Sequence, residues 1–333
     1  MPAPTELATI TQHVQVGIET TLGTAVAATK QLADLTQFSA TPANDVDMSQ
    51  RGAGQKIATF GIVGKEMTTI AIGGPLTFDS FAYWCNLAFR TGTIGAGGDA
   101  STRYHTFDLS QTAQETYSAF TIEHGDSVRA RKIPGVQLDS LSFTLDLAGN
   151  VAQWSGSGIG FPLVDGITLT GALPFVAVTP MSPANVDVFL DTTYAGAGGT
   201  RLSRVLKFDF AMSNHWDQFF TLDSTMVRHA AGMIETPPTI QVKLLLEADS
   251  AGMARLTALR AGTSQFVRVK VIGPVAGSST QNLQVDMALK ISSAGAIEDK
   301  NGVYGYEVTG DLVYDLTGTA SLKFRLENLL TAL

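Results

Sequence analysis

A few short stretches of the chain carry residue types that can do chemistry. His124-Gly-Asp126 places a base beside a carboxylate, the combination that general acid–base catalysis uses. Gly156-Ser-Gly-Ile-Gly160 is rich in glycine, as are the loops that bind phosphate. Asp299-Lys-Asn-Gly302 begins like a calcium-binding loop. Whether any of these stretches can do its chemistry depends on the strand, helix or turn that positions its side chains.

None of these stretches has the spacing that its chemistry requires. A local His-x-Asp is common by chance, and here we expect a turn after the strand that ends near Ile122. The glycine run lacks the dinucleotide-binding spacing and is followed by Phe161-Pro162 instead of a helix. A second glycine run, Gly95–Gly98, is not followed by the Lys-Ser/Thr of a P-loop. Asp299–Gly302 lacks the remaining calcium ligands, so we expect a hairpin turn.

Metal and thiol chemistry are equally poorly supported. The five histidines show no close metal-ligand pair, and Cys85 is the single cysteine, which excludes a disulfide framework and a thiolate metal site. Trp84 and Trp154 lie in apolar patterns typical of a hydrophobic core. We therefore expect no catalytic residue, no cofactor and no metal, and an enzyme is the least supported class.

Composition and charge narrow the remaining classes. The 333 residues are 44% hydrophobic and 16% charged, which is typical of a folded protein that buries surface against partners. The net charge is -8, with an acidic excess in both halves, so a surface that grips nucleic acid is not expected. Met1–Glu6 lacks the basic and apolar regions of a signal peptide, and no apolar run approaches the ~20 residues of a membrane span. We expect folding in a reducing cytosol and no membrane partner.

Strand patterns dominate the sequence. Leu138–Leu147 is apolar at every second position from Leu141 onwards, and Val151–Gly156 returns after a turn, which predicts a β-hairpin. Leu283–Ile291 and Tyr304–Leu312 repeat this plan. The fold class is therefore mainly β, with two tandem β-sandwich or barrel domains.

One flanking helix is expected in each domain. Phe78–Phe89 has a helical apolar face, with Asp79 or Ser80 as its N-cap. The corresponding helix would begin at Asp249 or Ser250 and bury Leu256 and Leu259.

Much of the chain repeats at one offset. Thr69-Ile-Ala-Ile72 matches Thr239-Ile-Gln-Val242, about 170 positions later, and the same offset pairs Val16 with Val186 and Phe38 with Phe208. After a slip to about 146, Phe120-Thr-Ile122 matches Phe266-Val-Arg268 and Val136-Gln-Leu-Asp139 matches Leu283-Gln-Val-Asp286. The repeat predicts a first domain over residues 1–170 with an extra surface loop at 90–114, a linker at 171–185 and a second domain over 186–333. Alternating all-β patterns can also give false internal matches.

Two long loops are expected at corresponding places in the repeat. Residues 41–65 and 213–238 each follow one matched strand and precede the next. At about two dozen residues each, they exceed ordinary connections, which indicates a role in function or partner contact.

The order of these elements resembles a known family. Gly17-Ile-Glu-Thr-Thr-Leu-Gly-Thr24, the long polar loop, the helical unit ending in Asn86-Leu-Ala-Phe89, Ser118-Ala-Phe-Thr-Ile-Glu123 and the Ser-Gly-Ser-Gly after Trp154 are similar to a major tail protein, the tube protein of long-tailed bacteriophages. The resemblance covers nearly the whole chain. It implies a β-sandwich with a helix that assembles into stacked sixfold rings around a lumen.

The resemblance also implies partners and a stoichiometry. Members usually carry one tube domain per chain, so a duplicated domain implies three chains in each pseudo-sixfold ring; six chains with an outer decorating domain is the alternative within the family. The implied partners are other copies of the chain, the tape-measure protein, the tail tip and tail terminator proteins, and DNA that passes without specific binding. The implied location is the phage tail of the virion, after synthesis in the host bacterial cytoplasm.

Two sets of candidate residues follow. The long loops are expected to make ring-to-ring contacts, and polar strand faces are expected to line an acidic lumen that repels phosphate. The ring-stacking candidates are Thr41, Pro42, Asp45, Arg51, Lys56, Lys65, His215, Asp217, Arg228 and Glu235, and the lumen candidates are Asp139, Asp146, Asp286 and Lys290. The competing function is a carbohydrate- or receptor-binding virion protein with tandem β-sandwiches, such as an adhesin or a capsid decoration protein.

Overall fold

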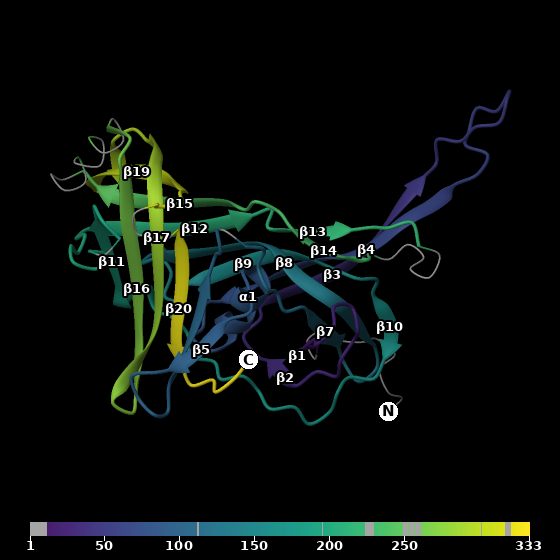
Figure 1. Cartoon of the computed structure of the whole chain (residues 1–333), viewed down its shortest axis with the longest axis horizontal. Helices are drawn as coiled ribbons and strands as arrows, with labels where there is room; N and C mark the ends of the chain where they lie inside the picture. The colour runs from purple at the N-terminus through teal and green to yellow at the C-terminus, as the bar shows by residue number, and fades with distance from the viewer. Residues whose placement is uncertain are drawn as a thin grey trace.

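The chain folds into antiparallel β-structure around a short helix, as the alternating patterns predict (Figure 1). The computed structural model describes residues 12–111, 113–194, 196–223, 230–248, 253, 257, 261–300, 302–316 and 321–333. The first half contains β1 His13–Ile18, β2 Lys30–Leu32, β3 Gln37–Asp47, β4 Ile62–Pro75, α1 Ser80–Ala88, β5 Thr93–Ala96, β6 Arg103–Asp108, β7 Phe120–Gly125, β8 Ala130–Asp146, β9 Gln153–Gly160 and β10 Val164–Ile167. The second half contains η2 Pro183–Asn185, β11 Val186–Asp191, β12 Val205–Ser213, β13 Trp216–Phe219, β14 Gly232–Glu235, β15 Thr239–Glu247, β16 Ser264–Ala276, β17 Ser279–Ala294, β18 Glu298–Lys300, β19 Val303–Leu312 and β20 Leu322–Asn328.

The pairing order of the strands repeats between the two halves. In the first half the order is β2-β1-β7-β8-β9-β4-β3. In the second half β11, β16, β17, β19, β15 and β12 follow one another in the same way, and a bridge from Phe189 to Arg201 stands where β2 does. The duplication seen in the sequence therefore has a counterpart in the topology. The expected helix at residues 249–262 falls largely outside the described residues.

The register of the repeat differs from the simple sequence offsets. Phe38 lies opposite Ile72, but Val242, the match of Ile72, lies opposite Phe210 and not Phe208. The match of Phe120 with Phe266 is also out of phase, because Phe120 lies in the hydrophobic core whereas Val267 and not Phe266 does so in β16. The structure shifts both sequence matches by one or two residues. Because apolar residues recur at every second position of a strand, the sequence pattern alone does not reveal such a shift.

Two strand pairs join the halves into one structure. β12 adds to the far half of β8, where Met212 lies opposite Leu141 and Phe210 opposite Phe143. β6 adds to β20, with Phe107 opposite Phe324. The segment predicted as a surface loop, 90–114, thus contains β5 and β6, and its aromatic Phe107 is buried. This expectation was wrong because Gly97 and Gly98 begin the turn at 97–102, while the residues on either side of the turn form strands.

The predicted linker is also packed against the first half. Val176 and Met181 are buried, Met181 N–H donates to Leu76 O at 2.8 Å, and Val176 N–H donates to Gln31 O at 2.9 Å. A segment held in this way is part of the fold. The boundaries 1–170, 171–185 and 186–333 stay a prediction about the repeat and do not mark separate cores.

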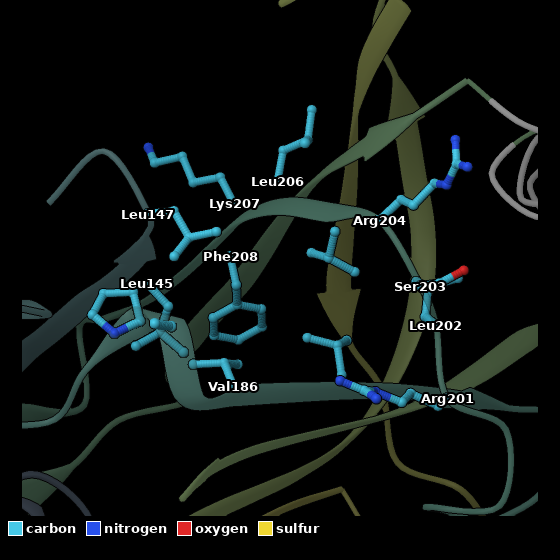
Figure 2. Close-up of a pocket in the computed structure, with 14 residues that line it drawn as sticks. Leu145, Leu147, Val186, Arg201, Leu202, Ser203, Arg204, Leu206, Lys207 and Phe208 are labelled. Carbon is cyan, nitrogen blue, oxygen red and sulfur yellow. The ribbon is translucent and has the colours of Figure 1, made fainter. Parts of the chain in front are cut away.

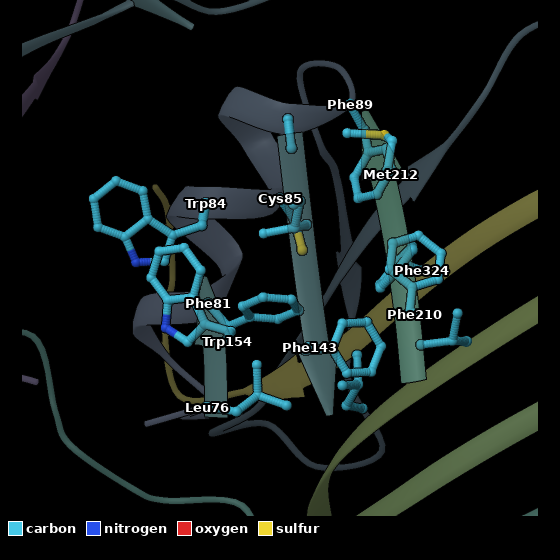
Figure 3. Close-up of a cluster of buried hydrophobic side chains, with 14 of the residues drawn as sticks. Leu76, Phe81, Trp84, Cys85, Phe89, Phe143, Trp154, Phe210, Met212 and Phe324 are labelled. Carbon is cyan, nitrogen blue, oxygen red and sulfur yellow. The ribbon is translucent and has the colours of Figure 1, made fainter. Parts of the chain in front are cut away.

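A single hydrophobic cluster runs through both halves (Figure 3). Phe143 and Trp154 contribute from the first half, and Phe210, Met212 and Phe324 from the second. All residues of α1 are buried in this cluster. The sequence pattern predicted a helix with one exposed face, and the structure shows none. Its N-cap is Asp79, whose side chain makes no capping hydrogen bond and instead accepts Leu329 N–H at 3.2 Å.

A buried carboxylate clamps the β5–β6 turn to the second half. Glu327 is 2% exposed and accepts hydrogen bonds from Gly98 N–H, Thr102 Oγ1 and Ser279 Oγ at 2.6–2.8 Å. Burial acts to raise the pKa of Glu327, but these donors together lower it. A carboxyl whose pKa is lower in the folded state stabilises the fold above its unfolded pKa and loses that contribution as the pH falls.

We expect Glu327→Gln to destabilise the protein at pH 7 and to flatten the loss of stability on acidification below about pH 4.5. The measurement is urea unfolding at several pH values. Asp217→Asn is the control, because Asp217 is exposed and its carboxylate accepts a hydrogen bond from the N–H of its neighbour Gln218. Equal pH dependence of the Glu327→Gln variant and the wild type would contradict the clamp.

Candidate functional site

The stretches that could have done chemistry have structural tasks. Asp126 Oδ1 accepts the N–H groups of Val128 and Arg129 and so closes the β7–β8 turn, as expected. His124 stacks on Phe38, with ring centroids 4.6 Å apart, and burial lowers its pKa. Asp299 Oδ1 accepts Gly302 N–H at 2.7 Å, which makes a hairpin turn. The two carboxylates therefore hold backbone turns, and the imidazole of His124 packs against an aromatic ring.

The Gly156–Gly160 run is a strand in the middle of the sheet. β9 pairs with β4 on one side and with β8 on the other. A Cβ at Gly158 would lie 2.5 Å from Gln137 O, and one at Gly156 would lie 2.8 Å from Ser140 O. The glycines therefore allow close strand approach beside a bulge in β8, which is a packing role and not phosphate binding.

One face of the sheet is polar across both halves, and we call it the polar face. A single row of opposed residues crosses β3, β4, β9, β8, β12, β15, β19 and β17 without a break. In Figure 1 most of these strands run side by side along the molecule. The row consists of Gln37, Gly73, Ser155, Ser142, Ala211, Gln241, Asp311 and Lys290.

The polar face changes character along its width. In the first half it is uncharged: Ser140 bonds Ser157 at 2.7 Å and Ser142 bonds Ser155 at 2.9 Å. In the second half it carries charges, and two of its lysines are ion-paired: Lys243 with Glu307 at 3.4 Å and Lys207 with Asp209 at 2.9 Å. Asp146, Asp209, Glu307 and Asp311 stand against Lys207, Lys243 and Lys290, so the face is close to neutral with a slight acidic excess.

Two of the four lumen candidates lie on this face. Asp146 and Lys290 belong to it, opposite Lys207 and Asp311. Asp286 is 4% exposed and binds Arg268 through two hydrogen bonds of 2.5 and 2.9 Å, so it cannot line an open surface. Asp139 sits at the β8 bulge and accepts Trp216 N–H at 3.3 Å. Asp286 is therefore a correction to the sequence prediction, whereas the lumen role of the partly exposed Asp139 stays a prediction.

The segment predicted as the first long loop is a β-hairpin that projects from the body (Figure 1). β3 and β4 pair from Gln37–Gly73 out to Asp47–Ile62. Six large apolar side chains near its end are exposed to solvent, and Ile57 reaches 80%. They are Val46, Met48, Ile57, Phe60, Ile62 and Val63. A projecting apolar surface of this kind indicates a binding partner.

The stacking candidates of this hairpin are all exposed. Thr41, Pro42, Asp45 and Lys65 lie on its two strands, and Arg51 and Lys56 lie near its tip. Lys65 Nζ lies 4.9 Å from the centre of the Phe220 ring, which ties the base of the hairpin to the second half. Their part in stacking stays a prediction. The apolar residues between them were missed because Pro, Asp and Gly hid the strand pattern.

The second predicted loop behaves differently. It contains the β13–β14 hairpin, which lies back on the body. His215 is fully buried, with Nδ1 2.6 Å from Ala88 O, and Trp216 Nε1 donates to the same oxygen at 3.2 Å. Glu235 is partly buried and accepts Glu115 N–H at 2.8 Å, whereas Asp217 is exposed. His215 is therefore corrected from a stacking residue to an anchor, and Arg228 lies outside the described residues.

A pocket of about 380 Å³ lies at the end of the β8–β12 joint (Figure 2). Leu145, Val186, Leu202 and Phe208 give it apolar walls. The cations in its lining are already ion-paired: Arg201 with Asp187, Arg204 with Glu247, and Lys207 with Asp209, at 2.5–2.9 Å. The pocket can hold an apolar side chain, and its lining offers no paired base and nucleophile.

Among the described residues, no three His, Cys, Asp or Glu side chains are grouped so that they could share a metal ion. No helix in the described part of the chain is long and apolar enough to cross a membrane. No protein-family model matches the sequence, and no curated protein matches it.

Proposed function

We propose that this protein is a structural subunit that assembles into stacked rings and forms a phage tail tube. The observation that carries the proposal is the polar face, which continues through both halves in one sheet. Among the described residues, it ends at β3, which pairs only with β4, and at the end of β17, which pairs beyond Lys290 only with β19. An exposed sheet edge can pair with a strand of another chain, and a closed ring removes all such edges. The polar face would then line the lumen.

The repeated pairing order supports three chains in each ring. Each chain supplies two units of the same topology, joined through β8 and β12. Three chains would provide six units in pseudo-sixfold symmetry, and half of the lateral joints would already exist within the chains. The projecting β3–β4 hairpin would contact the next ring through its exposed apolar residues.

The chemistry of the polar face suits a conduit. Serines that bond one another and the ion-paired Lys207 and Lys243 offer little free positive charge to phosphate, so DNA would pass without being held. The tape-measure protein would occupy the lumen first, and tip and terminator proteins would meet the ends of the tube. We propose a non-enzymatic role in the virion.

The test is negative-stain electron microscopy of the purified protein over a range of concentrations, with and without isolated tail tips. We expect rings or tubes with a central channel. A protein that stays monomeric under both conditions and binds a carbohydrate or receptor on an array would contradict the proposal and support the binding-module alternative.

A further inference from the structure

The two halves of the chain are joined by a strand pair whose equivalent, at the opposite ends of the repeat, has no partner strand among the described residues. Within the chain, β12 adds to the end of β8. The equivalent of β12 in the first half is β3, and the equivalent of β8 in the second half is β17, because they occupy the same places in the repeated pairing order. In the described residues β3 pairs only with β4, and β17 pairs beyond Lys290 only with β19.

The repeat also gives the register of the missing joint on its β17 side. Ile72 lies opposite Gly156, which lies opposite Leu141. In the second half, Val242 lies opposite Gly310, which lies opposite Ile291. Ile291 is therefore the equivalent of Leu141, and by the same steps Ser293 and Ala294 are the equivalents of Ser142 and Phe143.

The equivalent residues on the β3 side follow from the same comparison, through β4 in the first half and β15 in the second. Phe210 lies opposite Val242 and Phe38 lies opposite Ile72, so Phe38 is the equivalent of Phe210. Two residues further on, Ala40 is the equivalent of Met212, and Ser39 lies between them as Ala211 does. The facing agrees, because Phe38 and Ala40 both pack against the core from its border.

We propose that the end of β17 in one copy of the chain pairs antiparallel with β3 of a second copy, in the register that β8 and β12 use inside the chain. Ala40 would lie opposite Ile291 of the second copy, Ser39 opposite Ser293 and Phe38 opposite Ala294. This inference rests on the proposed function and specifies how its rings close.

Both sides of this joint have the side chains that such a pairing needs. Phe38, Ala40, Ile291 and Ala294 are apolar residues only partly buried at the border of the core, and the pairing would cover them. Ser39 and Ser293 would continue the polar face from one chain to the next. The part of β3 that would pair, Phe38–Ala40, carries no lysine or proline that would discourage pairing; Pro42 lies two residues further on.

The test uses cysteine pairs, since the native Cys85 is buried. Directly opposed residues on neighbouring antiparallel strands have Cα atoms about 4.5–5.5 Å apart, which lies within the range of about 4.4–6.8 Å that disulfides span. Ser39→Cys with Ser293→Cys, oxidised after assembly, should give covalent products of up to three chains on a non-reducing gel. Ser142→Cys with Ala211→Cys is the matched control, because these residues are opposed inside one chain and should close without linking chains. Thr41→Cys with Ser293→Cys tests a register shifted by two.

The outcomes separate the two proposals. Rings in which the control disulfide forms while the Ser39–Ser293 pair stays unlinked would overturn this joint and leave the ring function standing. Stronger linking of the Thr41–Ser293 pair would overturn the register. If the wild type and all variants stay monomeric at every concentration, with and without tail tips, both the proposed function and the joint are overturned.

Discussion

Replacing Ile57 and Phe60 with aspartate should stop tube growth while the subunit stays folded. The two side chains are 80% and 55% exposed on the projecting hairpin, so they contribute little to the core. If the next ring buries them, each contributes about 1.5–3 kcal/mol to the contact, and losing both raises the concentration needed for growth at least about a hundredfold. Light scattering against protein concentration, with electron microscopy of the products, measures this change.

The matched control for the hairpin is Val128→Asp. Val128 is 66% exposed in the β7–β8 turn, so the substitution adds a charge at a similarly exposed apolar position away from the hairpin. Circular dichroism should show the same fold for all variants. Tubes of normal length from the Ile57→Asp, Phe60→Asp variant at the wild-type concentration would exclude the hairpin from stacking. Removing residues 48–61 and joining the strands by Asn-Gly gives a second test of the same contact.

Phe210→Ala should lower the free energy of unfolding of the whole chain by about 3–5 kcal/mol. Phe210 is 1% exposed and stacks on Phe143 of the first half, with centroids 5.2 Å apart, and it meets the edge of Phe324 at 5.3 Å. Because this cluster belongs to both halves, we expect one unfolding transition and not two. Urea unfolding followed by tryptophan fluorescence and by circular dichroism should give coincident curves.

Phe175→Ala is the control for this effect, since Phe175 is 64% exposed and its loss should change stability by less than about 0.5 kcal/mol. Two separate transitions, with Phe210→Ala shifting only one of them, would contradict the shared core. Such a result would restore two independent tandem domains, as the sequence alone suggests.

The sequence predicts the elements better than their arrangement. The period of two in Leu141, Phe143 and Leu145 gives the face of β8 correctly, and the repeat at Thr69–Ile72 and Thr239–Val242 corresponds to β4 and β15. Burial of side chains at alternate positions leaves this local signal. α1 is also predicted close to its true bounds.

The long-range pairings leave no comparable signal. The sequence pattern of β8 does not indicate that β12 of the other half pairs with its edge. This pairing joins the two cores that were expected into one. Asp286 looks like a solvent-facing residue until Arg268 is found opposite it. The outer part of the β3–β4 hairpin, residues 41–65, was predicted as a loop because an exposed strand needs no apolar alternation. The serine rows of β8 and β9 were visible in the sequence, and their Ser-x-Ser spacing could have indicated the polar face.

The most direct test of the ring proposal is the number of chains in each ring. Native mass spectrometry of isolated rings, combined with class averages viewed down the ring axis, gives both the mass and the symmetry. We predict three times the 35.2 kDa chain mass and six similar lobes around a central channel. Rings with the mass of six chains would contradict the duplicated-ring arrangement, and a protein that forms no ring at any concentration or with tail tips would contradict the tube function.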